Sequence, residues 1–135
     1  MNDCIFCKLV AKQIPAVVVF EDNDVISFME LHPSAPGHVM VILKKHGRTL
    51  FDYKDNDLGK LMVGVKKVAK KVQVALNADA LSIGLNHMEK RGVPHLHFHI
   101  IPRFEGDNGG IMQTIVHNLP KEDRETIAQK IRNVE

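Results

Sequence analysis

The chain has 135 residues, of which 44% are hydrophobic and 25% are charged, and its formal net charge is +2. This length suits one domain with a core of its own, so we expect a single domain over residues 1–135. The mild charge argues against a nucleic-acid or membrane-surface protein, and the apolar runs are too short to span a membrane. The first residues carry no secretory pattern, which favours a cytoplasmic protein with reduced cysteines.

The N-terminal half predicts three strands in succession. Residues 16–20 and 24–31 are rich in β-branched and apolar side chains and are separated by a turn-like acidic stretch, which indicates a hairpin. A Pro-Gly pair then precedes residues 38–44, which are apolar on both faces, as in a central buried strand. His38 therefore lies at the entrance of the third strand.

Residues 57–76 predict one long amphipathic helix, because apolar side chains recur at helical spacing behind the candidate caps Asp55 and Asp57. The opposite face of this helix is rich in lysine. We interpret it as a solvated face without a binding role, since it has no aromatic side chains for stacking on bases.

The C-terminal half predicts two more strands, over residues 81–86 and 94–103. The glycine-rich residues 105–110 lack the ending of a phosphate loop and indicate a turn. Pro120 is expected to open a short C-terminal helix. The predicted fold is α+β, a five-stranded, mainly antiparallel sheet with one long central helix and a short C-terminal helix.

Three histidines alternate with apolar residues in the last predicted strand, at positions 95, 97 and 99. Because successive side chains of a strand point to opposite faces, the three imidazoles share one face while their neighbours enter the core. Exposed strand faces ordinarily carry Thr, Lys or Glu, so tolerated surface histidines are a poor explanation. The pattern therefore indicates a functional site.

Such a row fits either a metal site or an acid–base and nucleophilic site. At about 3.3 Å per residue, the Cα atoms of His95 and His99 lie roughly 13 Å apart, too far for both to bind one Zn²⁺. An extended substrate, such as a phosphate group with its ester, suits the row better.

Cys4 and Cys7 form a C-x-x-C pair, which is typical of metal ligands or of a redox couple. A tetrahedral zinc site needs two more ligands, and His46, after the third strand, is one candidate.

The segment from His95 to Ile101 resembles the signature of the histidine-triad superfamily. In that signature single apolar residues separate the three histidines, and two apolar residues follow the last histidine. The whole chain resembles the bacterial branch of its nucleotide-binding, Hint-type members. The resemblance implies a HIT-like fold, a homodimer and a nucleotide hydrolase. Its other matching segments are Cys4-Ile5-Phe6-Cys7-Lys8, Ile14-Pro15, Phe20-Glu21-Asp22, Phe28-Met29-Glu30-Leu31, Pro36-Gly37-His38, Lys45-His46 and Ile101-Pro102-Arg103.

For the histidines, the resemblance implies a mechanism in which His97 attacks the α-phosphorus of a purine nucleotide conjugate and water opens the nucleotidyl-histidine. A hydrogen bond from its other ring nitrogen must fix the tautomer, and a backbone carbonyl is the expected acceptor. His99 would bind the phosphoryl oxygens or protonate the leaving group, and His38 would orient the triad.

The expected substrates are nucleoside phosphoramidates or related adenylates. Two alternatives remain open: a dinucleoside polyphosphate hydrolase, and a nucleotide-binding regulatory module with little turnover.

The resemblance also implies a pocket for an AMP- or GMP-type nucleotide. Phe6, Leu9 and Leu31 would surround the base, although Phe6 and Leu31 also suit a core. Glu30 would accept from the ribose hydroxyls where the family commonly has Asp, and Asn86 resembles a sugar-contacting residue.

One loop departs from the family pattern, because Lys90 and Arg91 stand where many members have Gly-Gln. Arg91 either replaces the lost amide as a phosphate donor or points into solvent.

Finally, similar bacterial proteins hold a structural zinc. Their ligands correspond to Cys4, Cys7, His46 and His95 of this chain, which leaves His97 and His99 for the chemistry.

Overall fold

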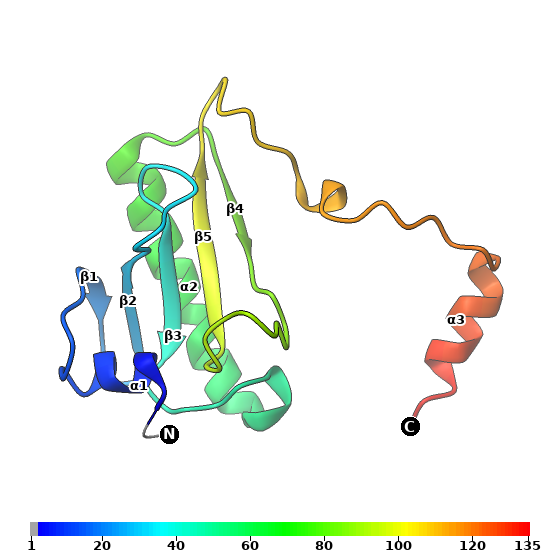
Figure 1. Ribbon diagram of the computed structural model, residues 1–135, viewed down its shortest axis with the longest axis horizontal. Coiled ribbons are helices and arrows are strands. Elements are labelled where there is room, and N and C mark those ends of the chain that lie inside the picture. Colours follow the sequence, from blue (N-terminus) through cyan, green and yellow to red (C-terminus); the bar gives the residue numbers. More distant parts are fainter. Residues whose placement is uncertain (1–2) are drawn as a thin grey trace.

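The computed structural model describes residues 3–135. It contains a five-stranded sheet and three α-helices, shown in Figure 1. The helices are α1 (Ile5–Val10), α2 (Asp55–Leu76) and α3 (Arg124–Arg132), with 3₁₀ turns η1 (Leu50–Asp52) and η2 (Met112–Thr114). The strands are β1 (Val18–Glu21), β2 (Val25–Met29), β3 (Val39–Leu43), β4 (Ala80–Gly84) and β5 (His97–Arg103).

The sheet has the order β1-β2-β3-β5-β4, and every neighbouring pair is antiparallel. The register places Met40 of β3 and Gly84 of β4 on either side of His99. Ile42 lies opposite His97 in the same way. The predicted α+β fold is confirmed, and the central strands bring the third strand beside the histidines.

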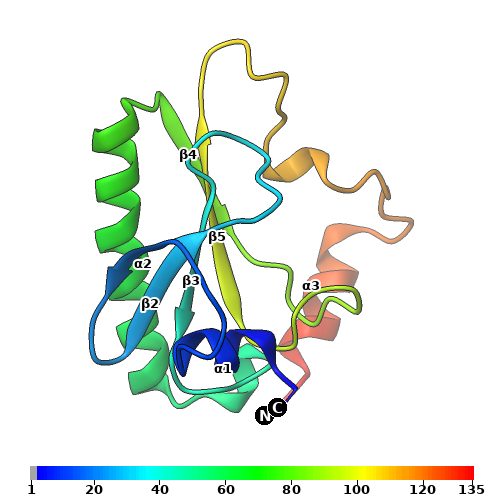
Figure 2. The ribbon, with the colours of Figure 1, turned by 60° about the vertical axis from the view of Figure 1, so that its left-hand side comes forward.

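Helices cover both faces of the central strands. On one face, α2 packs Leu61, Val65 and Val68 against the interior. On the other face, Phe6 and Leu9 of α1 pack in a second apolar cluster with side chains of β2 and β3. Figures 1 and 2 show these two helices beside the sheet. Burial on both sides explains why β3 is apolar throughout.

The turn before β3 depends on a glycine. Gly37 has φ +84°, a conformation that L side chains rarely adopt, and a Cβ there would lie 2.0 Å from the Cδ1 atom of Leu76. The predicted Pro-Gly turn thus delivers the chain to His38, the residue directly before β3.

Several predicted boundaries change. Lys54, not an aspartate, is the N-cap of α2, and Asp55 and Asp57 lie in its first turn, where they favour the helix dipole. β5 begins at His97 rather than at Pro94, so His95 lies in the preceding loop. β4 likewise ends at Gly84, short of the predicted limit at Asn86.

The helices also differ from expectation at both ends of the chain. The helix α1 was not predicted, because six residues are too few to show a helical period. The C-terminal helix begins at Arg124 rather than at Pro120, and the Asp123 side chain caps it by accepting from the backbone N–H of Thr126.

After β5 the chain leaves the sheet as an extended segment, residues 104–135, which we call the arm; it includes η2 and α3. Figure 1 shows α3 standing apart from the layered body. Apolar side chains of the arm are open to solvent, including Leu119, which is 89% exposed, and Ile131, which is 69% exposed. No residue of α3 belongs to either of the two apolar clusters of the sheet. Within residues 3–135, no helix combines the length and apolar character needed to cross a bilayer.

Candidate active site

The imidazoles of His97 and His99 lie side by side on β5, with ring centroids 5.0 Å apart. Both side chains are half-buried, whereas His95 is only 1% exposed. Phe6 of α1 meets the rings of His95 and His97 edge-on, at 6.0 and 5.3 Å between centroids. The row of histidines therefore faces the α1 side of the sheet, away from α2.

A backbone carbonyl determines which nitrogen of His97 carries the proton. Its Nδ1 atom lies 2.7 Å from the carbonyl oxygen of His95, and a carbonyl can only accept. Nδ1–H is therefore the donor, and the neutral ring keeps a lone pair on Nε2. This is the tautomer that an attacking imidazole requires.

A chain of hydrogen bonds determines the tautomer of His99 as well. The backbone N–H of Ser34 donates to Nδ1 of His38 over 3.1 Å, so the neutral His38 ring carries its proton on Nε2. That N–H points at Nδ1 of His99, 2.9 Å away. His99 must accept at Nδ1 and therefore presents Nε2–H as a donor.

Burial favours the neutral form of both rings in this chain. It lowers the pKa of His38 and of His99 from the ordinary 6.5, and the neighbouring His97 and His38 lower that of His99 further. Glu30 opposes the shift through its negative charge. The proton arrangement described above is consequently the one expected at neutral pH.

We expect the rings of His38 and His99 to titrate below pH 6.5. The hydrogen bond between the two rings then persists at neutral pH and is lost as the pH falls, because a proton on Nδ1 of His99 would face the His38 N–H. The unfolded chain titrates near 6.5, so folding stability also declines below that pH. An NMR titration of the ring signals checks this, and midpoints at or above 6.5 for both rings would contradict it.

A second prediction separates the donor function of His38 from its bulk. His38→Ala leaves Nδ1 of His99 without its donor, so we expect kcat of a reaction that uses the imidazole pair to fall about 10²-fold with little change in KM. His38→Gln keeps an N–H at the same reach and should recover most of the loss. Equal activity of the two variants, measured at steady state, would show that the hydrogen bond has no catalytic consequence.

Four side chains from distant parts of the chain form a candidate metal centre: Cys4, Cys7, His46 and His95. One ligand atom from each lies within 4.8 Å of all the others. Cys4 is the N-cap of α1 and Cys7 lies in its first turn, so the spacing i, i+3 brings their thiols to the same side of the helix start. The structure therefore brings together the four residues that the resemblance implies as ligands, and they could hold a metal ion.

The donor atoms fit tetrahedral zinc. Bonds of about 2.3 Å to sulfur and 2.0–2.1 Å to nitrogen require sulfur–nitrogen separations of about 3.6 Å. The structure has 3.6 Å from Cys4 Sγ to His95 Nδ1, 3.7 Å from Cys7 Sγ to the same atom, and 3.2 Å from Cys7 Sγ to His46 Nδ1.

Protonation states also favour a cation at this place. His95 donates Nε2–H to the Leu43 carbonyl oxygen over 2.8 Å, which frees the Nδ1 lone pair. Burial lowers the pKa of His95 to about 4, so the ring is neutral. Burial and the neighbouring Cys4 raise the pKa of the Cys7 thiol, and a bound cation would reverse that penalty.

Glu30, His38 and His99 form a second cluster of potential ligands. A metal between the two rings would need lone pairs on both facing nitrogens, which would move the His38 proton onto Nδ1. That proton would meet the Ser34 N–H, which already donates to Nδ1. The cluster is therefore better explained as a proton-ordered hydrogen-bond chain than as a metal site.

The residues expected around a nucleotide lie in different environments. Phe6 and Leu9 are buried at 6% and 7% exposure, in keeping with a core role, whereas Leu31 is 85% exposed. Glu30 is half-buried and accepts from the backbone N–H of His32 over 3.2 Å. Asn86 lines a cavity together with His99.

Arg91 is exposed in the loop between β4 and β5. Two backbone groups on which the site depends could not be predicted from residue types, the Ser34 N–H and the Leu43 carbonyl. Backbone donors and acceptors leave no residue-type signature.

Comparison with known proteins decides the family. The profile described as the HIT domain matches residues 11–106, most of the chain. This chain belongs to the HIT domain family. The adenosine 5′-monophosphoramidase of Saccharomyces cerevisiae is 32% identical to it over 133 residues, which cover 93% of this chain and 82% of the relative. The family thus includes a nucleotide hydrolase similar to this HIT protein.

Solved structures agree with the fold. A member of the HIT family from Bacillus subtilis superposes with a TM-score of 0.83 at 30% identity, covering 98% of each chain. A zinc-bound histidine-triad protein from Mycobacterium smegmatis superposes with a TM-score of 0.74 at 28% identity, covering 79% of each chain. The arm of this HIT protein is thus included in the first of these matches.

Proposed function

We propose that this HIT protein hydrolyses purine nucleoside phosphoramidates or related adenylates through a nucleotidyl-histidine intermediate. The observation that carries the proposal is the pair of ring tautomers at the site. His97 has a lone pair on Nε2, and the neighbouring His99 has an N–H on Nε2. A nucleophile and a donor for phosphoryl oxygens are what displacement at phosphorus requires. The similarity to a monophosphoramidase supports the same reaction class.

In the first step, the Nε2 lone pair of His97 forms a bond to the α-phosphorus. The phosphorus–nitrogen bond to the leaving amine breaks, and the amine departs with that electron pair and takes a proton from solvent. In the second step, water bonds to phosphorus and releases a proton to solvent, while the electron pair of the phosphorus–His97 bond returns to Nε2. The sum is one water consumed, with one nucleoside monophosphate and one amine formed.

His99 has the role of binding oxygen in this scheme. If His99 gave up its Nε2 proton, a neutral ring would need a proton on Nδ1, and His38 would have to supply it. His38 would then need a proton on its own Nδ1, where it already accepts from the backbone N–H of Ser34. His99 therefore keeps its Nε2 proton. Its N–H instead stabilises the charge that develops on the phosphoryl oxygens, an effect typically worth about 10²–10³-fold. His38 is a positioning residue that keeps His99 in this tautomer.

Zinc is proposed as the structural ion of the Cys4, Cys7, His46 and His95 centre. It would join α1 to the loop before β5 and supply no chemistry at phosphorus. Its support is the donor geometry of this chain and the zinc-bound relative.

One experiment tests the proposal against its two rivals. The protein is incubated with an adenosine phosphoramidate and with a diadenosine polyphosphate, and mass spectrometry follows AMP release and any adduct on His97. Preferred cleavage of the phosphoramidate with a trapped adduct is expected. Preferred cleavage of the polyphosphate favours the polyphosphate hydrolase, and AMP binding without any turnover favours a regulatory module.

We also propose a homodimer, in keeping with the resemblance to Hint-type proteins. The support on this chain is the exposed apolar arm, in which Ile115 is 69% and Val116 is 66% exposed. Several apolar side chains exposed along one segment are typical of an interaction surface. A single species of one chain mass in analytical ultracentrifugation at micromolar concentration would overturn it.

A further inference from the structure

An open groove of about 590 Å³ lies between β1 and the C-terminal half of α2. Its apolar lining comes from Phe20 of β1 and from Val74 and Ala75 of α2, and Val74 is 73% exposed. Its charged lining consists of Lys67, Lys70 and Lys71. We call it the Lys71 groove. The sequence alone favoured a solvated lysine face on this helix, and the structure places an apolar surface among the charges.

An irregularity in β1 turns Phe20 toward α2. Val18 lies opposite Phe28, whereas Phe20 lies opposite Ser27, so β1 has one extra residue between the two pairs. Phe28 belongs to the apolar cluster on the α1 side, but Phe20 packs against the cluster that contains Val65 of α2. The bulge therefore brings an aromatic ring to the groove.

β1 is also an open edge of the sheet. It has one neighbouring strand, β2, because the strand order is β1-β2-β3-β5-β4. Val18 is 43% and Val19 is 42% exposed, and β1 contains no lysine or proline, which commonly protect an edge from further pairing. Figure 1 shows β1 on the side of the sheet away from the arm. The proposed dimer through the arm would therefore leave this edge accessible.

The groove has positive charge that its acidic neighbours do not neutralise. In the turn after β1, Glu21 and Asp24 pair with other lysines, at 2.9 and 3.2 Å. Asp22 accepts from backbone N–H groups of the same turn over 2.8 Å. Among residues 3–135, neither Lys70 nor Lys71 forms a salt bridge. Charge complementarity therefore points to an acidic partner.

We propose that the β1 edge and the Lys71 groove together bind an extended, acidic segment of another protein. Such a segment would pair with β1 as a sixth strand and place every second side chain on the α2 side of the sheet. An apolar side chain there would contact Phe20 and Val74. Acidic side chains two positions before and after it would meet Lys70 and Lys71.

A peptide fits this surface better than the other anionic partners do. A nucleic acid binds through successive aromatic rings, and the groove has one, Phe20. An anionic membrane would use the lysines but not the backbone groups at the β1 edge. The inference does not depend on the proposed hydrolase function, because the histidines of β5 face the α1 side of the sheet.

The probe is a short fluorescent peptide in which threonine alternates with glutamate, valine and glutamate, so that the last three share one face of a strand. Fluorescence anisotropy should show binding at low salt that weakens as salt is added. Changing both glutamates to glutamine, or the valine to serine, should each weaken binding about fivefold or more. Hydrogen exchange at the β1 amides should become slower when the peptide is present.

Lys71→Glu reverses one charge of the groove and should weaken binding of the peptide about fivefold or more, since an attraction becomes a repulsion. Lys66→Glu is the matched control, because it makes the same change at an exposed lysine of the same helix that does not line the groove. It should alter the affinity less than about twofold, and both variants should melt within a few degrees of the wild-type protein.

Three results would overturn the inference: no binding of the acidic peptide, equal weakening by Lys71→Glu and Lys66→Glu, or unchanged exchange in β1. Tighter binding of a single-stranded oligonucleotide, or of phosphatidylserine vesicles, than of the peptide would also overturn it. Protection of β1 that rises with protein concentration in the absence of peptide would assign the edge to a second copy of this chain instead.

Discussion

Replacing His97 by alanine is expected to lower kcat for an adenosine phosphoramidate by about 10⁴-fold or more, because the step at phosphorus loses its nucleophile. AMP should bind within a few-fold of the wild-type affinity, since the ring contributes one contact among many. Single-turnover kinetics measure the loss, and calorimetric titration with AMP measures binding. The adduct seen by mass spectrometry should disappear together with turnover.

The matched control is His117→Ala, an exposed histidine of the arm. It removes the same side chain without touching the row on β5, so its kcat should equal that of the wild-type protein. If the wild-type and His97→Ala proteins turn over equally slowly while both bind AMP, the enzymatic proposal is wrong. The protein would then be a nucleotide-binding module.

Zinc removal should have the largest effect on stability. Cys4→Ser replaces a side chain that is 4% exposed with one of nearly the same shape but without a thiolate, so we expect the metal to be lost. A ligand present at a thousand times its Kd stabilises the folded state by about 4 kcal/mol. For a chain of this size, the loss corresponds to roughly 10 °C in Tm.

Metal analysis and calorimetry check this prediction. The wild-type protein should carry about one zinc per chain and, after chelation, melt where Cys4→Ser melts. Added zinc should restore the wild-type protein but not the variant. A wild-type protein whose melting is indifferent to the chelator would show that the cluster is two free thiols beside two histidines.

The local pattern of β5 was readable without a structure, because alternation in a strand is a property of the backbone alone. That His97 and His99 share a face follows from their spacing, whatever packs around them. The long helix α2 was readable for the same reason, since its period extends over many turns. Short elements carry less signal, and α1 shows the consequence.

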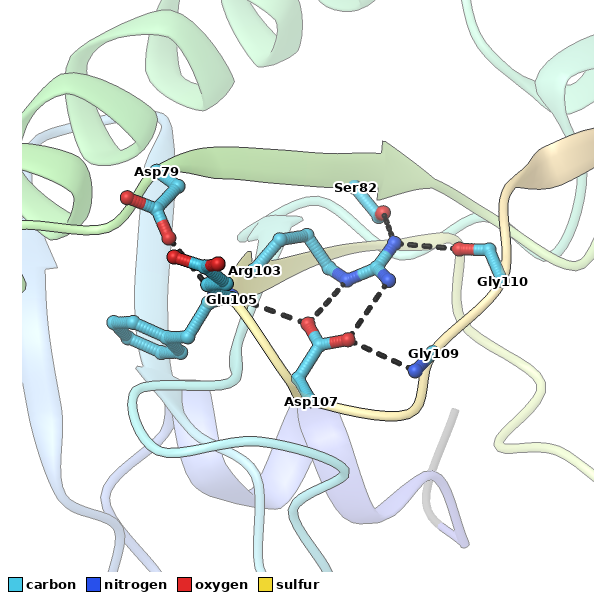
Figure 3. Close-up of polar contacts among 8 residues, drawn as sticks. Asp79, Ser82, Arg103, Glu105, Asp107, Gly109 and Gly110 are labelled. Atoms are coloured by element: carbon cyan, nitrogen blue, oxygen red, sulfur yellow. Dashed lines mark hydrogen bonds and ion pairs between the residues drawn. The ribbon is translucent and has the colours of Figure 1, made fainter.

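The amino-acid sequence by itself indicated the five strands, the long helix, the family and the facing imidazoles, because each depends on periodicity or on residues close together in the chain. Only the tertiary structure decided which ring nitrogen of each histidine holds the proton, since the partners are the backbone groups of Ser34, Leu43 and His95. It also decided that the Arg103 guanidinium joins β4 to the segment after β5, by donating to the Ser82 hydroxyl and to the Gly110 carbonyl (Figure 3), because these residues have no common local pattern.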